Sequence, residues 1–406
     1  MKNAIKKIAP NFLLNWYHWF LPAIGAVLYG FPSGKIKVIG VVGTDGKSTT
    51  VFLISQILEE AGYKVAFLSS IFFKIGKKEW KNTLKMTMPG RLKLQRFLRD
   101  AVRAGCQYAV LETTDEGIKQ HRHRFIDFKT AVLTNITPEH IEAHGSFEKM
   151  RIENEKLFQI AKEVHIVNLD DENAEYFLQF PAKKKINYQV KEGQILIDRN
   201  QIPLNLRLLG EFNLYNAAAA ISAGLSEGIS LEICKRAVEK IEGIPGRMEV
   251  VIKEPFTVIV DYAHTVNALE KVYQTIQDSK FKIQDSKMIC VFGSCGGGRD
   301  RWKRPEFGKI ASRYCDEIIL TNEDPYDENP LHILSDIEKG FSQFSNYRKI
   351  LDRREAIKKA LGLAKPGDVV IITGKGCEPW LCLANNKKIP WDDRQVVREE
   401  FKKALI

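Results

Sequence analysis

The sequence predicts an α/β protein with two domains, and three observations lead to this prediction. From residue 35 onward, short β-branched segments alternate with segments of helical character, which is typical of a parallel sheet covered by helices on both faces. A second alternating series begins near residue 247. The stretch between the two series is mostly helical and ends at the Gly- and Pro-containing segment 243–247, where we expect a hinge.

The first series provides the strands and helices of a central domain that contains a P-loop. Its strands are expected at 37–43, 107–114, 130–136 and 164–170, and its helices include 48–62 and 89–105. The second series predicts a smaller, Rossmann-like α/β domain with strands at 257–263, 287–297, 316–324 and 368–376. The expected divisions are an apolar N-terminal segment, a central domain and a C-terminal domain, at residues 1–34, 35–245 and 246–406.

Composition describes a globular protein with anionic partners. Of its 406 residues, 44% are hydrophobic and 27% charged, which excludes a disordered chain. The net charge of +11 suits nucleic acid, phosphorylated metabolites or acidic membrane surfaces. No basic run with interleaved aromatic residues is present, so we expect no nucleic-acid partner. We also expect a monomer.

The cysteines indicate a reducing compartment. There are seven, an odd number, and no C-x-x-C pair occurs among them. This pattern argues against a disulfide framework and against structural zinc, and it favours the cytoplasm.

The segment VIGVVGTDGKSTTVFL, residues 38–53, follows a predicted strand and opens a predicted helix. It resembles the G-x-x-x-x-G-K-[ST] loop, except that Val41 stands where the first glycine is usual. In this context backbone N–H groups and the helix N-terminus face phosphate groups. Lys47 would reach the β- and γ-oxygens, and Ser48 would offer its hydroxyl to magnesium. The segment therefore predicts a nucleotide site.

Two further residues follow predicted strands. Glu112 ends one strand and His140 comes shortly after another. Because ligands collect at the carboxyl ends of parallel strands, both are expected to face the phosphates. A magnesium ion that bridges phosphates needs only one or two carboxylates, whereas histidine is a less usual ligand.

The first 34 residues are basic at the start and apolar in the middle, which superficially suggests a signal peptide. Asn15, His18 and Pro22 interrupt the apolar run, and export would separate a nucleotide site from its nucleotide. Two alternatives remain: a helix packed on the next domain, which is favoured, or a helix in a membrane interface that makes peripheral contact with lipid. In the second, the aromatic residues at headgroup level are Trp16, Tyr17 and Trp19.

The order of several short motifs resembles the Mur ligase family, most closely its MurE type, from about residue 35 to the C-terminus. These motifs are GTDGKSTT, LETTDEGIKQHR, TNITPEHIEAHGSFEKMRIENEKLF, GEFNLYNAAAA, IPGRME, VDYAHT, VFGSCGGGRDRWKRP, DRREAI, GKGCE and DDR. The family's loop is G-T-x-G-K-[ST]-[ST], which requires no glycine at Val41. The resemblance implies an ATP- and magnesium-dependent ligase that adds an amino acid to a UDP-N-acetylmuramoyl-peptide during peptidoglycan synthesis.

The resemblance also implies roles for individual residues. Those implied for catalysis are Lys47, Glu112 and His140, and those implied for magnesium are Ser48, Glu112 and His140. Those implied for ATP are Gly43, Thr44, Asp45, Gly46, Lys47, Ser48, Thr49, Asn213, Asn216, Arg247, Asp261 and His264. Those implied for the muramoyl-peptide are Thr87, Thr114, Gln120 and Arg122, and those implied for the incoming amino acid are Asp324, Tyr326 and Glu378.

The chemistry that the family implies begins with attack of a carboxylate on the γ-phosphoryl group, which gives an acyl phosphate. The amine of the amino acid then displaces phosphate. Positioning and electrostatics contribute most of the rate, and closure of the C-terminal domain is expected to exclude water.

Asn154 departs from the family pattern, because it stands where the family has a lysine that is carbamylated near the second magnesium. Either Glu153 or Glu155 supplies the missing charge, or the second metal binds weakly, or the substitution is harmless.

Tyr326 stands where diaminopimelate-adding members have an arginine that pairs with the second carboxylate of that amino acid. Because Asp324 precedes it closely, a basic or neutral amino acid such as lysine is favoured. The family's N-terminal UDP-binding domain also has no counterpart in residues 1–34, which suggests altered uridine recognition or a lipid-linked or shortened acceptor.

Several other functions remain open. Within the same class, the ATP-binding half also suits ligases like cyanophycin synthetase or folylpolyglutamate synthetase. From other classes, a P-loop kinase or transport ATPase, or a degenerate membrane-associated binding subunit, would share some of the motifs. Substrate-dependent release of ADP and the formation of an amide distinguish a ligase from both.

Overall fold

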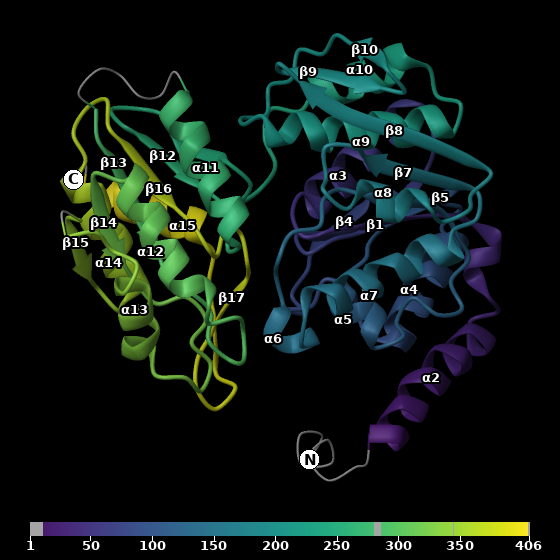
Figure 1. Ribbon diagram of the computed structural model, residues 1–406, viewed down its shortest axis with the longest axis horizontal. Helices are drawn as coiled ribbons and strands as arrows, with labels where there is room; N and C mark the ends of the chain where they lie inside the picture. Colours follow the sequence, from purple (N-terminus) through teal and green to yellow (C-terminus); the bar gives the residue numbers. More distant parts are fainter. Residues whose placement is uncertain (1–10, 280–285, 344, 405–406) are drawn as a thin grey trace. The chain divides into compact units, whose positions relative to one another are not determined.

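A computed structural model describes residues 11–279, 286–343 and 345–404, with side chains from residue 20 onward (Figure 1). Its internal contacts divide the chain into two compact units. The first contains the chain up to Thr137 together with Phe147–Leu206 and Asn213–Lys240. The second contains Pro138–Ser146, Arg207–Phe212 and the chain from Ile241 onward.

A ten-stranded sheet forms the centre of the first unit, in the order β10-β9-β8-β7-β6-β1-β5-β2-β3-β4. Its strands are β1 (Lys37–Val42), β2 (Val65–Leu68), β3 (Phe72–Ile75), β4 (Lys78–Lys81), β5 (Tyr108–Glu112), β6 (Phe128–Leu133), β7 (Val164–Asn168), β8 (Lys184–Lys191), β9 (Gln194–Ile197) and β10 (Asn200–Ile202). The six strands from β8 to β2 pair in parallel, as predicted. The sheet is mixed, however, because antiparallel strands extend both edges.

The first unit also contains helices, most of which cover the two faces of this sheet. They are α2 (Asn11–Leu28), η1 (Pro32–Lys35), α3 (Lys47–Glu60), α4 (Arg91–Arg103), α5 (Asp115–Lys119), α7 (Phe147–Ile160), α8 (Ala174–Leu178), α9 (Phe212–Ser226) and α10 (Leu231–Glu239). Helices α4, α5, α7 and α8 contribute Leu94, Ile118, Leu157 and Phe177 to one buried core. Helix α3 contacts β1, β2 and β5, and α10 packs on α3. The central strands are therefore buried on both sides, which explains their continuous apolar sequence.

The second unit has a six-stranded sheet in the order β11-β12-β16-β13-β14-β15 and a separate hairpin of β17 and β18. Its elements are α6 (Ile141–His144), β11 (Glu249–Ile252), β12 (Thr257–Val260), α11 (Val266–Asp278), β13 (Met288–Phe292), α12 (Lys303–Tyr314), β14 (Glu317–Leu320), α13 (Pro330–Glu338), β15 (Tyr347–Lys349), α14 (Arg353–Leu363), β16 (Val369–Ile372), β17 (Trp380–Cys382), β18 (Lys388–Pro390) and α15 (Asp393–Ala404). Residues of β13 alternate between two cores: Cys290 and Phe292 join α11, α12 and α13, whereas Ile289 and Val291 join α14 and α15.

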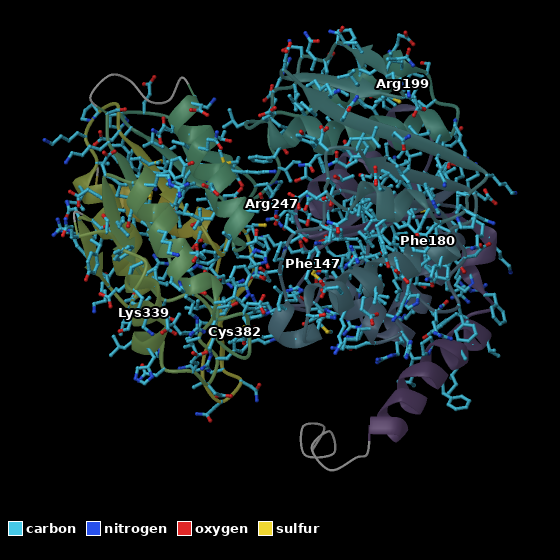
Figure 2. The ribbon with its side chains drawn as sticks, viewed as in Figure 1. Phe147, Phe180, Arg199, Arg247, Lys339 and Cys382 are labelled. Atoms are coloured by element: carbon cyan, nitrogen blue, oxygen red, sulfur yellow. A yellow bond between two sulfur atoms is a disulfide. The ribbon has the colours of Figure 1, made fainter. Side chains whose placement is uncertain are left out.

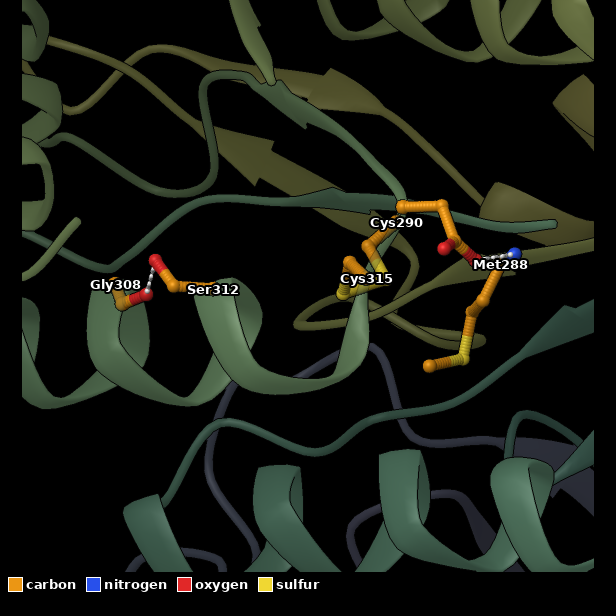
Figure 3. The surroundings of a disulfide bond; sticks show 6 residues. Met288, Cys290, Gly308, Ser312 and Cys315 are labelled. Atoms are coloured by element: carbon orange, nitrogen blue, oxygen red, sulfur yellow. Dashed lines mark hydrogen bonds between the residues drawn. A yellow bond between two sulfur atoms is a disulfide. The ribbon is translucent and has the colours of Figure 1, made fainter. Parts of the chain in front are cut away.

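One disulfide contradicts the cysteine prediction (Figure 3). Cys290 of β13 and Cys315 at the end of α12 are bonded, with their Cα atoms 6.0 Å apart. Asp316 brings them together, because its backbone N–H donates to the carbonyl of Met288 and its carboxylate accepts from the backbone N–H of Met288 at 2.7 Å. The adjacency depends on the parallel pairing of β13 with β14, which the number and spacing of cysteines do not indicate.

The N-terminal segment forms α2, which packs against α4, so the favoured alternative of a packed helix is confirmed for the described part. No described helix has the length and apolarity needed to cross a lipid bilayer.

Candidate functional site: a phosphate loop and a buried ionic cluster

The loop between β1 and α3 requires glycine at two positions. Gly43 and Gly46 have φ values of +139° and +81°, which other residues rarely adopt. A Cβ atom at Gly43 would lie 2.1 Å from Thr134 Oγ1, and one at Gly46 would lie 2.2 Å from Asn216 Oδ1. The predicted loop is therefore closely packed on its supporting residues.

Residues that follow β6 hold this loop in place. The backbone N–H of Thr44 donates to the carbonyl of Asn135 at 2.8 Å, and that of Asp45 donates to Asn135 Oδ1 at 2.9 Å. Thr134 Oγ1 donates to the carbonyl of Asp45 at 2.7 Å, and Thr44 Oγ1 donates to the carbonyl of Thr137 at 3.0 Å. The sequence analysis missed Thr134 and Asn135 as site residues, although the polar run directly after a predicted strand was a usable signal.

Lys47 is the first residue of α3, and its ammonium group lies over the loop. Its Nζ donates to the carbonyls of Gly43 and Thr44, both at 2.7 Å. The N-terminus of α3 carries a partial positive charge beside this ammonium group. The loop therefore presents a cation and a helix N-terminus together, as a phosphate group requires.

Glu112 and Ser48 are brought together at the carboxyl ends of neighbouring strands. Ser48 Oγ donates to Glu112 Oε2 at 2.8 Å, and the backbone N–H of Ser70 donates to the same oxygen at 2.8 Å. The hydroxyls of Ser48 and Ser70 are 2.7 Å apart. Oxygen donors of this kind suit a hard divalent cation. Ser70 follows β2 and was missed, because its proximity depends on the strand order β1-β5-β2.

Asn213 and Asn216 lie near the start of α9 and support the loop. Asn216 Nδ2 donates to Asn213 Oδ1 at 2.9 Å, and Thr50 Oγ1 donates to Asn216 Oδ1 at 3.4 Å. Thr49, the other predicted loop residue, is buried in the first turn of α3. Asn216, which was predicted to bind the nucleotide, thus contacts the glycine loop directly.

The predicted acceptor residues gather around Met88. Arg122 Nη1 donates to the Met88 carbonyl, and Arg122 Nη2 donates to Gln120 Oε1 at 2.8 Å. The backbone N–H of Thr114 lies 3.5 Å from the Met88 sulfur, and half-buried Thr87 precedes it in the chain. Burial lowers the pKa of Arg122 from its ordinary value. The structure therefore brings these residues together, with a guanidinium at their centre.

Asn154, in α7, is 2% exposed. Its Nδ2 donates to the backbone carbonyl one turn earlier at 3.0 Å, whereas its Oδ1 is buried without a hydrogen-bond partner among the described residues. Glu153 lies 2.6 Å from Lys156 Nζ, and Glu155 accepts from the hydroxyl of Tyr176. Both acidic neighbours therefore have partners of their own.

In the second unit, Asp261 and His264 follow β12. The Asp261 carboxylate accepts from two backbone N–H groups at 2.6 Å each, and His264 Nδ1 lies 2.9 Å from the Tyr262 carbonyl. Burial, and then the charge of Lys303, hold the pKa of His264 well below its ordinary value. The guanidinium of Arg247, labelled in Figure 2, stacks 4.5 Å from the centre of the Tyr262 ring. These predicted residues form one cluster.

The predicted amino-acid site contains a fully buried lysine that the sequence analysis did not single out. Lys375 Nζ lies 3.0 and 2.9 Å from the two oxygens of Asp324, and it also bonds Glu378. Glu378 accepts from the Tyr262 hydroxyl at 3.2 Å. Lys375 is in the GKGCE motif, where only Glu378 was assigned a role. The conspicuous signal was a lysine between two glycines directly after a strand.

Tyr326 is held by close packing on a glycine-rich loop. Its φ is +51°, and its backbone N–H donates to the carbonyl of Cys382, which is labelled in Figure 2, at 3.3 Å. A Cβ atom at Gly297 would lie 2.6 Å from the Tyr326 ring. Burial raises the pKa of Tyr326.

Two more buried groups complete this cluster. Cys295 Sγ donates to Glu323 Oε1 at 3.1 Å, and burial raises the pKa of Glu323. Arg353 forms two hydrogen bonds to the carboxylate of Asp393, at 2.9 and 2.7 Å. Neither Glu323 nor Arg353 was predicted as a site residue.

His140 belongs to the second unit through the segment Pro138–Ser146. It has a φ of +55°, and its Nε2 lies 3.0 Å from Arg299 Nη1. Asp300 accepts from two backbone N–H groups of α6, and Lys303 pairs with Glu139 at 2.8 Å. The segment that bears His140 is therefore held by residues 299–303.

Two protein-family models match the chain. Residues 41–224 match the model described as Mur ligase middle domain, and residues 246–376 match the model described as Mur ligase, glutamate ligase domain. The chain belongs to the Mur ligase family.

Several curated relatives are Mur ligases of the MurE type. UDP-N-acetylmuramoyl-L-alanyl-D-glutamate–2,6-diaminopimelate ligase of Syntrophomonas wolfei is 38% identical over 403 residues, which cover 93% of this chain and 81% of the relative. UDP-N-acetylmuramyl-tripeptide synthetase of a Roseiflexus species is 35% identical over 93% of this chain and 81% of its own. The chain is thus a MurE-type Mur ligase, an ATP-dependent acid–amino-acid ligase.

Solved structures share this fold. A UDP-N-acetylmuramoyl-L-alanyl-D-glutamate–2,6-diaminopimelate ligase aligns with a TM-score of 0.60 at 30% identity and covers 91% of this chain and 79% of its own. Folylpolyglutamate synthase of Mycobacterium tuberculosis aligns with a TM-score of 0.72 over 87% of this chain and 92% of its own, at 16% identity.

Proposed function

We propose that this Mur ligase joins an amino acid to the terminal carboxyl group of a UDP-N-acetylmuramoyl-dipeptide, with ATP as the activating substrate and magnesium as the cofactor. The observation that supports it best is the arrangement of Lys47, Ser48 and Glu112, in which a cation, a helix N-terminus and oxygen donors share one edge of the sheet. The cytoplasm is the compartment that we propose for this activity, and the ATP requirement and the family's role in peptidoglycan synthesis support it.

In the first step, a carboxylate oxygen of the acceptor attacks the γ-phosphorus of ATP, and the bond to the β,γ-bridging oxygen breaks to release ADP. Lys47 is proposed to exchange its two carbonyl contacts for phosphate oxygens, which stabilises the charge that develops there. Ser48 and Glu112 would hold magnesium, which would supply further positive charge beside the same oxygens. The glycine loop fixes the phosphates by its backbone N–H groups.

Arg122 is proposed to orient the acceptor. Its guanidinium is largely buried, and its Nε has no hydrogen-bond partner among the described residues. An anionic group of the muramoyl-peptide would satisfy this donor with a charge-assisted hydrogen bond. Thr87, Thr114 and Gln120 lie beside it and supply further polar contacts. This arrangement would hold the carboxylate for attack rather than take part in bond formation.

In the second step, the amine of the amino acid attacks the acyl carbon, and inorganic phosphate leaves with the oxygen that came from the carboxylate. Glu378 and Asp324 are proposed to bind the amino acid, and Arg247, Asp261 and His264 are proposed to bind ATP. His264 is neutral at pH 7, because its pKa lies well below its ordinary value.

The amino acid is proposed to be lysine. Tyr326 provides no guanidinium to pair with a second carboxylate, and its ring is packed against Gly297. Lys375 already pairs with Asp324, so this carboxylate does not need a cation from the bound amino acid. Glu378 retains 19% side-chain exposure and is the acid placed best for a side-chain ammonium group. Diaminopimelate is the competing candidate, because several curated relatives are named for it.

A competition experiment tests the proposal. The protein is incubated with ATP, magnesium, UDP-muramoyl-dipeptide and equal amounts of lysine and diaminopimelate, and the product masses are measured together with ADP. We expect the lysine adduct to predominate, and Tyr326→Arg to shift the ratio toward diaminopimelate by about 10²-fold, while Tyr347→Arg, at an exposed site, leaves it unchanged.

Each outcome has a distinct meaning. Exclusive incorporation of diaminopimelate by the unaltered protein would overturn the choice of lysine. ADP release with a phosphorylated product but no amide would indicate a kinase, and absence of acceptor-dependent ADP release would indicate a binding subunit.

A further inference from the structure

The described part of helix α2, from residue 20 onward, places four large apolar side chains on the surface that faces solvent. Phe20, Ile24, Val27 and Leu28 are 44, 52, 67 and 68% exposed. Their spacing of three and four residues puts them in one row along the helix. Phe31, just after the helix, is 53% exposed and extends the row.

The opposite surface of α2 consists of small residues that pack on α4. Pro22, Gly25 and Ala26 are buried. A Cβ atom at Gly25 would lie 3.2 Å from side-chain atoms of both Leu92 and Gln95. An ordinary surface helix turns its large apolar residues toward the core, and the described part of α2 does the reverse at Ile24, Val27 and Leu28. Packing among the described residues therefore does not explain the exposure of these three side chains.

Helix α4 adds positive charge beside the apolar row. Its sequence, RLKLQRFLRDAVR, has five basic residues and one acidic residue. Lys93, Arg96 and Arg103 are exposed. A Cβ atom at Gly30 would lie 3.9 Å from Arg99 Nη1, which places that guanidinium at the end of the row. Asp100 pairs with Arg96 at 3.7 Å, so most of the positive charge of α4 remains uncompensated within the helix.

We propose that the α2–α4 surface, defined as Ile24, Val27, Leu28 and Phe31 with Lys93, Arg96, Arg99 and Arg103 of α4, binds an anionic lipid bilayer. The apolar row would enter the boundary between headgroups and acyl chains, while the guanidinium and ammonium groups would pair with anionic headgroups. Because α2 is packed along α4, only its outer surface is available, so the helix would lie in the plane of the interface.

Charge favours a bilayer over a second copy of the chain. In a twofold dimer the same surface meets itself, which would bring the basic residues of one α4 close to those of the other. An anionic bilayer instead offers opposite charge beside an apolar layer. The proposal concerns a surface of the first unit and does not depend on the chemistry proposed above.

Vesicle flotation of the full chain tests this proposal. We expect binding to vesicles of phosphatidylcholine with phosphatidylglycerol, much weaker binding to pure phosphatidylcholine, and release at high salt. Val27→Glu should lower binding at least tenfold, because it puts a charge in the apolar row. Arg96→Gln with Arg103→Gln should lower it roughly thirtyfold, at about fivefold per charge.

A matched control is Leu331→Glu, which alters an apolar residue of α13 that is 49% exposed, and it should bind as the unaltered protein does. Circular dichroism and ADP release check that each variant is folded. Equal binding of the Val27→Glu variant and the unaltered protein would overturn the proposal. The proposal would also be overturned if the unaltered protein did not bind vesicles and light scattering instead showed a dimer that Val27→Glu abolishes.

Discussion

The phosphate loop of the first unit and the amino-acid cluster of the second unit hold their charges in different ways. In the loop, Lys47 contacts two backbone carbonyls, and Glu112 accepts from hydroxyl and amide donors. In the cluster, fully buried Lys375 is paired with Asp324 and Glu378. The loop thus keeps a cation that a polyanionic ligand can capture, whereas the cation of the cluster is already paired with two carboxylates. The first arrangement is suited to catalysis and the second to shape-dependent recognition.

The largest expected effect is on catalysis by the loop. Lys47→Ala should lower kcat about 10³-fold, roughly 4 kcal/mol, because it removes a preorganised charge from the transferring phosphoryl group. Its stability should change little, because only two backbone carbonyls lose a partner. Acceptor-dependent ADP release measures the effect, with Lys191→Ala as an exposed control. A loss of less than tenfold would contradict the role of Lys47.

A substitution in the amino-acid cluster of the second unit should have the opposite effect: it should lower the stability of the protein more than its activity. Lys375→Met leaves buried Asp324 and half-buried Glu378 without their cation and should lower the free energy of unfolding by about 3–5 kcal/mol. Adding Asp324→Asn should recover a large part of the loss. Urea denaturation provides the measurement.

The control for this variant is Lys339→Met. Lys339, labelled in Figure 2, pairs with Asp336 but is 68% exposed, so its replacement should change stability by less than about 0.5 kcal/mol. Similar effects of the two replacements would refute the distinction between the buried and the exposed pair.

Acid should destabilise the first unit through His123. Burial, followed by the charges of His121, Lys156 and Arg124, lowers the pKa of His123 to about 3. The unfolded chain therefore binds a proton that the folded chain excludes between pH about 6.5 and about 3, and stability falls as pH falls through this window.

The free energy of unfolding should drop by roughly 2 kcal/mol between pH 7 and pH 5 through this residue alone. In His123→Leu that contribution disappears, and the dependence contributed by His165 and His264 remains. Urea denaturation at the two pH values compares the proteins, and an unchanged pH dependence would show that His123 is not the responsible group.

Among the substitutions of buried residues, the smallest expected change in stability is at Asn154. Its Oδ1 is buried without a hydrogen-bond partner among the described residues, so Asn154→Leu should change the free energy of unfolding by less than about 1 kcal/mol. The magnesium concentration for half-maximal activity should rise, because the amide oxygen stands at the family's metal-associated position. Lower stability with unchanged magnesium dependence would instead assign the amide a structural role.

The phosphate loop was predictable because its residues are contiguous in the chain. Glu112 was predictable because the carboxyl ends of parallel strands lie at one edge of a sheet. Ser70 was not, because its contact with Glu112 depends on β2 lying beside β5. The strand order is set by packing between helices far apart in the sequence, and neither charge nor periodicity reports it.

The edge strands of the sheets and the buried charged residues were the features that the sequence predicted least well. Strand β4, KEWK, is exposed throughout and lacks the apolar alternation that marks a strand. The position of Lys375 between two glycines is conspicuous in the sequence, but its burial is not, because that burial depends on Asp324 from another strand end. The Cys290–Cys315 bond likewise depends on strand pairing rather than on cysteine spacing.

The transfer of an acceptor oxygen to phosphate tests the central claim most directly. An acceptor labelled with ¹⁸O in its terminal carboxylate is incubated with ATP, magnesium and lysine, and the released phosphate is analysed by mass. If the loop at Lys47 activates the carboxylate as an acyl phosphate, each phosphate that accompanies an amide contains one ¹⁸O. Amide formation with unlabelled phosphate would contradict the account.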